Sequence, residues 1–180
     1  MEMSVVIPIL IIIIFIASLI VVMYRNLTKS HKKVKNTWNQ IDFQIKRKID
    51  LIPNLIEVSR GHVDKDILES ISLSRTNMLM CSNPKELAML NNNLNDYLSV
   101  LFQFGEKSES LNNSNTFKHI KSQFAECNES ISKDRLFYND AVYKYNDDCE
   151  RFPTCFVAKI FNFKNEEFFK TTSFIDELFN

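Results

Sequence analysis

The chain has little of the material from which turn-rich sheets and glycine-rich binding loops are built. Its 180 residues include only two glycines and four prolines. A protein with many β-hairpins needs these residues at its turns, and a phosphate-binding or dinucleotide-binding loop needs glycines at fixed spacing. The composition therefore favours long helices with few connections and argues against such loops.

The chain also lacks an excess of charge and the usual signatures of a metal site. Lys plus Arg and Asp plus Glu each number 22, so electrostatics gives no reason to expect nucleic acid as a partner. The four cysteines form no CxxC pair, which fits reduced thiols better than a disulfide scaffold. The three histidines lack the helical spacing of a zinc site. We expect no metal or other cofactor, no catalytic residue and no enzymatic activity.

A long uncharged run rich in Ile, Val, Leu and Phe occupies residues 3–24. At ~1.5 Å per residue a helix of this length crosses a ~30 Å hydrocarbon core. A cleaved signal has a positive N-terminal region and an apolar core of about 7–15 residues, whereas the only charge before this run is Glu2. The sequence predicts a transmembrane helix at 3–24, followed by one helical domain at 25–180.

Basic side chains dominate the residues that follow the run. Between Arg25 and Lys48 the only acid is Asp42. The positive-inside rule then places the N-terminus outside a cell membrane and the rest of this single-pass chain in the cytoplasm. The basic residues are also suited to contact anionic headgroups, and the sequence leaves open whether they do or serve only as a topology signal.

Apolar residues recur every three or four positions beyond the run, which predicts four amphipathic helices. The first runs from 27 to about 60 and ends at Gly61, with Pro53 either bending it or marking a restart. The second runs from Asp64 or Asp66 to Leu79. The third begins with Asn83 as its N-cap, and the fourth runs from Phe117 until Pro153 stops it. The residues expected to be buried in the second helix are Ile67, Ile71, Ser74 and Met78, and in the third Leu87, Leu90, Leu94, Tyr97, Leu101 and Phe104.

The expected fold class is all-α: an N-terminal transmembrane helix, then an up-and-down four-helix bundle of long, coiled-coil-like helices with a Phe-rich C-terminal tail. Residues 105–115 are polar and read as the one substantial loop. The tail, 153–180, holds seven phenylalanines from Phe156 to Phe179. So many phenylalanine side chains must be buried against another surface. The sequence leaves open whether that surface is the bundle flank, the membrane interface or a partner.

Several segments in order resemble the LemA family of bacterial membrane proteins. They are WNQIDFQIKRKIDLIPNL from Trp38, Arg75, RLFYNDAVYKYND from Arg135, Phe152-Pro153, and VAKIFNFK from Val157. The resemblance implies an N-terminal membrane segment, a bundle of long helices and no established enzymatic activity. The family often has an acid three residues before the position of Ile131, where this chain has Asn128.

The residues singled out for structure or interaction cluster in these segments. We expect Asp50 to pair with Lys46 or Arg47 one turn earlier, or to reach Tyr138 or Tyr145. A buried acid held by a tyrosine and an arginine would fix the register of the helices. Tyr138 and Tyr145 lie one heptad apart and so on one face of the helix. We expect both rings to be in the core, with their hydroxyl groups as polar tips. Asn54 and Asn139 read as caps or as partners of backbone freed by Pro53. The complete set is Trp38, Asp42, Arg47, Asp50, Pro53, Asn54, Arg135, Tyr138, Asn139, Tyr145, Phe152 and Pro153.

Two functions from different classes remain. The first is a non-enzymatic, membrane-anchored scaffold or adaptor for unidentified protein partners, with a homo-oligomer left open. The second is a membrane-tethered sensor that binds an anion, a lipid headgroup or a small ligand. A third alternative is a hydrolase built on Asp42, Asp50 and the acids near Asp148, although no nucleophile motif accompanies these acids.

Overall fold

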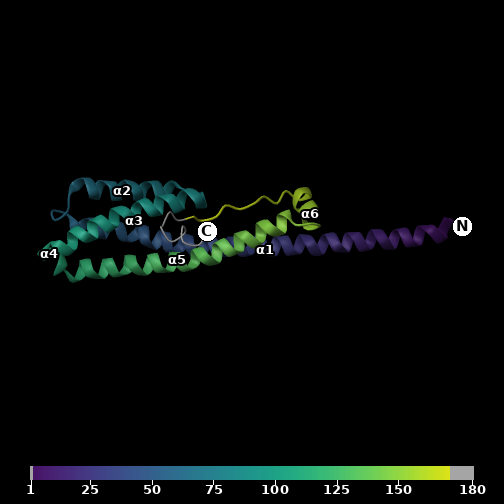
Figure 1. The fold of residues 1–180 in the computed structure, drawn as a ribbon, viewed down its shortest axis with the longest axis horizontal. Helices are drawn as coiled ribbons and strands as arrows, with labels where there is room; N and C mark the ends of the chain where they lie inside the picture. Colours follow the sequence, from purple (N-terminus) through teal and green to yellow (C-terminus); the bar gives the residue numbers. More distant parts are fainter. Residues whose placement is uncertain (1, 171–180) are drawn as a thin grey trace. The chain divides into compact units, whose positions relative to one another are not determined.

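The protein is all-helical in the computed structural model, which describes residues 2–170, with side chains from residue 6 onward. The helices in chain order are α1 (Glu2–Ser59), α2 (Lys65–Met80), α3 (Pro84–Lys107), α4 (Glu109–Asn112), α5 (Asn115–Glu150) and α6 (Thr154–Ile160) (Figure 1). No strand occurs among residues 2–170. The predicted all-α class is confirmed.

Helix α1 joins the apolar run to the amphipathic stripe without a break. Side chains from Val6 to Val22 are exposed, and an 18-residue window there has a mean hydropathy of 3.3 with none of its residues buried. By length and composition this part of α1 can cross a membrane. The helix continues through Pro53 to Ser59, so the restart at Pro53 is wrong. Gly61, with φ of +83°, follows the helix end as predicted.

The chain divides into two compact units, each described separately below. One combines Met1–Thr37 with Asn139–Glu166, and the other combines Trp38–Tyr138 with Glu167–Asn180. We call them the anchor unit and the core unit. Helices α1 and α5 contribute to both units.

The core unit is built on the apolar stripes that the sequence predicts. Ile41, Ile45, Ile52 and Leu55 of α1 are buried, as are Phe117, Phe124 and Ile131 of α5. Helices α2 and α3 pack against each other, and Arg75 Nε of α2 donates to the Ile49 carbonyl of α1 at 3.3 Å. The side chains of these elements therefore share a hydrophobic core.

The predicted helix starts are correct, but some buried faces are rotated. Asp64 accepts from the Asp66 amide at the start of α2, and Asn83 accepts from the Glu86 amide at the start of α3. In α2 the predictions for Ile71, Ser74 and Met78 are confirmed, while Leu68 is buried in place of Ile67, which is only half-buried. In α3 the predictions for Tyr97 and Phe104 are wrong, because these side chains are 40% and 50% exposed. The buried positions Leu87, Asn91, Leu94, Leu98 and Leu101 follow a different three-and-four spacing.

The predicted loop at 105–115 is mostly helical, so that prediction is wrong. Helix α3 continues to Lys107 and the short α4 follows immediately. Gly105 does not break the helix. Gly105 leaves room for a neighbouring side chain, because an added Cβ would overlap Cζ of the buried Phe117 ring. The polar composition of this segment therefore reflects exposed helical faces.

The anchor unit contains the N-terminal part of α1, the last turns of α5, and α6 with the extended segment after it. Helix α5 ends at Glu150, just before Phe152-Pro153, as predicted. Helix α6, which the sequence did not predict, follows and buries Val157 and Ala158. Figure 1 shows α6 beside α1, with the apolar N-terminal part of α1 continuing beyond it. Phe174 and Phe179 of the predicted Phe-rich tail lie outside the described residues.

Candidate functional site

The basic run Lys46-Arg47-Lys48 divides over three faces of α1, because successive helical residues are turned by about 100°. Lys46 Nζ lies 2.6 Å from Asp42 Oδ2 on the surface, and Arg47 lies 3.4 Å from Glu126 Oε2 on α5. Lys48 is fully buried. The basic run thus contains one residue that belongs to the core.

Three asparagine side chains enclose the amine of Lys48. Nζ donates to Oδ1 of Asn91 at 2.8 Å, of Asn95 at 2.5 Å and of Asn128 at 2.8 Å. Asn91 and Asn95 are one turn apart on α3, and Asn128 is on α5. An ammonium group has three donors, and each has an oxygen partner here. This cluster, which we call the lysine–asparagine cluster, connects α1, α3 and α5.

Burial and the three oxygens act on Lys48 in opposite directions. Loss of hydration disfavours the charged amine and lowers the pKa of Lys48 from 10.5 to about 7. The three oxygens favour the ammonium, because a neutral amine would direct its lone pair at one of them. The adjacent Cys127 thiol carries no opposing charge near neutral pH, because burial raises its pKa. The pKa of Lys48 therefore lies closer to neutral pH than that of an ordinary lysine.

A cavity of about 300 Å³ opens in the core unit. It is lined by Trp38, Asp42, Ile45, Lys46, Ile49, Met78, Leu79, Cys81, Ser82 and Leu87. The lining does not include Lys48. A lysine of lowered pKa is a candidate base or nucleophile only if substrate reaches it, and this cavity does not provide that access. The geometry therefore assigns Lys48 to helix positioning.

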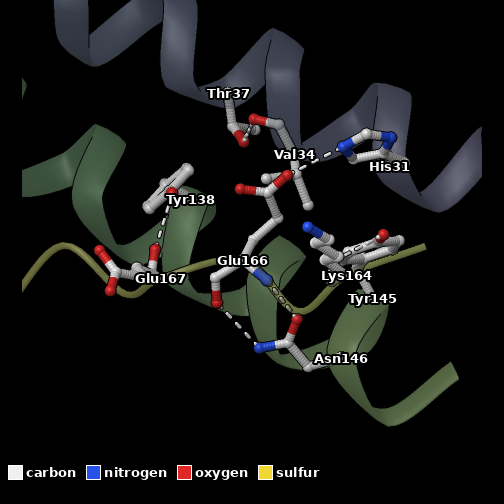
Figure 2. A network of polar contacts seen from close by, with 9 residues as sticks. All are labelled: His31, Val34, Thr37, Tyr138, Tyr145, Asn146, Lys164, Glu166 and Glu167. Carbon is white, nitrogen blue, oxygen red and sulfur yellow. Dashed lines mark hydrogen bonds and ion pairs between the residues drawn. The ribbon is translucent and has the colours of Figure 1, made fainter. Parts of the chain in front are cut away.

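A second polar cluster in the anchor unit holds the backbone of the segment after α6 (Figure 2). Tyr145 OH donates to the Lys164 carbonyl at 2.9 Å. Asn146 makes a two-way contact with Glu166: its Nδ2 donates to the carbonyl at 3.0 Å and its Oδ1 accepts from the amide at 2.9 Å. His31 of α1 lies 2.9 Å from Glu166 Oε1 and stacks on the Tyr145 ring. Burial raises the pKa of Tyr145, so the hydroxyl stays a donor.

The core unit holds the next residues of the same segment through Tyr138 and Trp38. Tyr138 OH donates to the Glu167 carbonyl at 2.8 Å, and Asn83 Nδ2 donates to Glu167 Oε2 at 2.7 Å. The Trp38 ring lies 5.4 Å from Tyr138 and 6.0 Å from the buried Phe169, centroid to centroid. The expectation of buried tyrosines with polar tips is confirmed, and their partners are backbone carbonyls.

The structure brings only some of the predicted residues together. Trp38 and Tyr138 meet in the core unit, whereas Asp50, Pro53 and Asn54 are exposed. The prediction that Asp50 is buried and paired is therefore wrong, because its position in the helix faces away from the apolar stripe. Arg135 and Asn139 are half-buried on α5, while Phe152 and Pro153 are exposed at its end. Asp42 and Arg47 make the surface ion pairs given above.

Sequence reasoning missed Lys48 and the three asparagines that bind it. A signal was present, because Lys48 lies three residues after Ile45 and four before Ile52, which are both buried. Asn91 likewise lies between Leu87 and Leu94 at helical spacing. A polar residue at a stripe position on one helix, with another on a facing helix, indicates a buried polar contact.

No group of three or more His, Cys, Asp or Glu side chains suited to a metal ion occurs within the described part of the chain. Fold and clusters define an all-helical protein whose first helix joins an exposed apolar run to a packed domain. A model of the LemA family matches residues 37–177. The chain belongs to the LemA family. Comparison with curated proteins gives no match.

Proposed function

We propose that the chain is a membrane-anchored, non-enzymatic scaffold that holds protein partners at the cytoplasmic face of a cell membrane. The observation that carries the proposal is the continuity of α1. One helix runs from the exposed apolar run into the region that matches the LemA family.

The domain at 25–180 acts in this proposal as an up-and-down bundle of α1, α2, α3 and α5. The lysine–asparagine cluster supports such an arrangement, because Lys48 bonds to α3 and α5 at one level. A buried polar cluster fixes the register of helices that apolar packing alone would let slide. A rigid surface of this kind suits the docking of partners.

Partner contact is supported by large apolar side chains exposed on the core unit. Phe43 of α1 and Leu136 and Phe137 of α5 are each 63–65% exposed. Aromatic side chains that gain cover on binding are the usual anchors of protein interfaces. A second copy of the chain is one such partner, and nucleic acid is not expected.

A photo-crosslinking amino acid at Phe137, in cells that express the full chain, tests the scaffold. We expect adducts with distinct proteins from Phe137 and none from the exposed Lys133, one turn earlier and itself paired with Glu129. Adducts that contain only this chain would restrict the role to self-assembly. Absence of adducts from both Phe137 and Phe43 would refute the scaffold.

Orientation has its own test. We expect a reporter that works only in the cytoplasm to be active when fused after Asn180, because the basic residues that follow the run favour the cytoplasm. A reporter that works only outside the cytoplasm should be inactive at the same position. Activity confined to the outer compartment would reverse the proposed topology. This test does not depend on the identity of any partner.

The sensor is the second candidate, and the cavity lined by Trp38 and Lys46 favours it. Trp38 is the only tryptophan of the chain, so its fluorescence reports on this cavity. Titration with inorganic phosphate or glycerol phosphate should change the emission if an anion binds beside Lys46. The change should persist in Lys133→Ala and vanish in Lys46→Ala. An unchanged emission in the full chain would count against the sensor.

A further inference from the structure

Three large apolar side chains at the end of α5 and on α6 lack cover from the described residues. Phe152, Phe156 and Ile160 are 76%, 59% and 72% exposed. They follow one another at intervals of four residues, and the rings of Phe152 and Phe156 are 6.0 Å apart. Phe156 and Ile160 share one side of α6, and Phe152 lies in the turn before it. Val157 and Ala158 face inward. A grouped apolar surface of this kind marks an interaction site.

Aromatic contacts tie this apolar stripe to the end of the proposed membrane span. The ring of Phe161 lies 4.7 Å from the ring of Tyr24, and the ring of Phe163 lies 5.8 Å from it. Tyr24 is the last residue of the uncharged run, and Arg25 is the first charged residue after it. Tyrosine at such a position lies at headgroup level when the helix spans a bilayer.

The contacts between α5 and α1 in the anchor unit also place the apolar stripe near the end of the apolar run. Ser30 Oγ donates to Asp148 Oδ2 at 2.8 Å, and His31 stacks on Tyr145. Higher residue numbers on α5 thus pair with lower residue numbers on α1. The two helices are antiparallel here, so α5 runs back toward the apolar run. Helix α5 ends two residues beyond Asp148, about 3 Å at the helical rise, and Phe152 follows in the turn after it. The stripe therefore lies near the last turns of the span.

Basic side chains accompany the stripe. Lys159 precedes Ile160 and is exposed, and Arg25 and Lys29 are exposed on α1 just after the span. Apolar and basic side chains together are typical of segments that lie in the interface of an anionic bilayer. Each such cation contributes roughly 1 kcal/mol near the surface of an anionic membrane.

We propose that Phe152, Phe156 and Ile160 insert into the interface of the bilayer that the N-terminal helix crosses, so that α6 makes a second membrane contact. The inference rests on the proposed anchor. Lipid is the occupant because the stripe is continuous with the apolar run through Phe161 and Tyr24 and is accompanied by cations. The second contact restrains rotation of the N-terminal part of α1 about its axis.

Tryptophan quenching by brominated lipids tests the inference in the full chain. Vesicles contain phosphatidylcholine and phosphatidylglycerol, with or without bromine on the acyl chains near the headgroups. The emission of the unsubstituted chain, due to Trp38, is subtracted from that of each variant. We expect bromine to reduce the added emission of Phe156→Trp and of Leu19→Trp within the span. Tyr143→Trp, at an exposed position of α5 about 10 Å by helical rise before the end of that helix at Glu150, should keep its emission.

The outcomes separate this inference from the anchor beneath it. Loss of emission for Leu19→Trp without loss for Phe156→Trp refutes the second contact and leaves the anchor intact. No loss for either variant refutes the anchor as well. Blue-shifted but unquenched emission from Phe156→Trp means that protein, either a second copy or the chain itself, covers the stripe, and this also overturns the inference.

Discussion

Lys48 shows how one residue can differ in role from its neighbours in a basic run. Lys46 and Arg47 pair with acids at the surface, while Lys48 is enclosed by three amide oxygens. A buried amine is costly unless its hydrogen bonds are complete. The three asparagines complete them, so the cluster favours one relative position of α1, α3 and α5.

The first prediction concerns the pH dependence of stability. The folded chain loses the Lys48 proton near pH 7, whereas the unfolded chain keeps it until about pH 10.5. The cost of burying the charge is therefore fully present below pH 7 and is relieved as the pH rises toward 10. Relative to Lys48→Met, the free energy of unfolding should rise by up to ~1.4 kcal/mol per pH unit in this window.

Denaturant unfolding of both full chains in detergent micelles between pH 6 and pH 9.5 measures this rise. The comparison with Lys48→Met removes the contribution of other titrating groups. Parallel curves for the two chains would contradict the prediction. They would mean that the amide oxygens keep Lys48 charged throughout the range.

The second prediction concerns Asn128, whose Oδ1 lies 2.8 Å from Lys48 Nζ. Asn128→Asp places a carboxylate beside the amine and should raise the pKa of Lys48. In the same unfolding series, the rise in stability should then begin at a higher pH. Asn93→Asp, at an exposed position of α3, is the matched control and should leave the onset unchanged.

At the scale of elements, periodicity predicted where helices occur better than which face is buried. The caps at Asp64 and Asn83 and the stop before Pro153 depend on local chemistry and are correct. The burial of Tyr97 and Phe104 depends on the rotation of α3 against its neighbours. Asn91, which reaches Lys48, lies on the buried face of α3 between Leu87 and Leu94.

Gly105 gives the third prediction, at the contact of α3 with α5. Gly105→Ala improves helix propensity by ~1 kcal/mol, but the added Cβ would overlap the Phe117 ring. Overpacking typically costs ~1–3 kcal/mol, and Phe117 is buried against Phe102, so its ring has little room to move. We expect a net loss in the free energy of unfolding on the order of 1 kcal/mol.

Thermal unfolding followed by circular dichroism checks this loss. Asn93→Ala, at an exposed position of the same helix, gains propensity without the overlap and should raise the melting temperature slightly. Equal stabilisation by the two alanine substitutions would show that the Phe117 ring can move aside.

The whole molecule combines an apolar helix with a packed helical domain, and the fourth prediction tests whether that helix stays. We expect the membrane fraction to contain the uncleaved 21.1 kDa chain, resistant to extraction at alkaline pH. Deletion of residues 2–24 should release the chain from the membrane. Mass spectrometry of a shorter chain that begins after the apolar run would mean that the run is a cleaved signal.

The sequence by itself determined the helix class, the apolar run, the helix caps and the family, because each depends on neighbours in the chain or on local motifs. Tertiary structure decided what the polar residues do. Asp50 faces outward, Lys48 faces inward, and Tyr138, Tyr145 and Asn146 hold the backbone of residues 164–167. The hydrogen-bond partners of Lys48, Tyr138, Tyr145 and Asn146 are 19 to 80 positions away, at distances that no local pattern encodes.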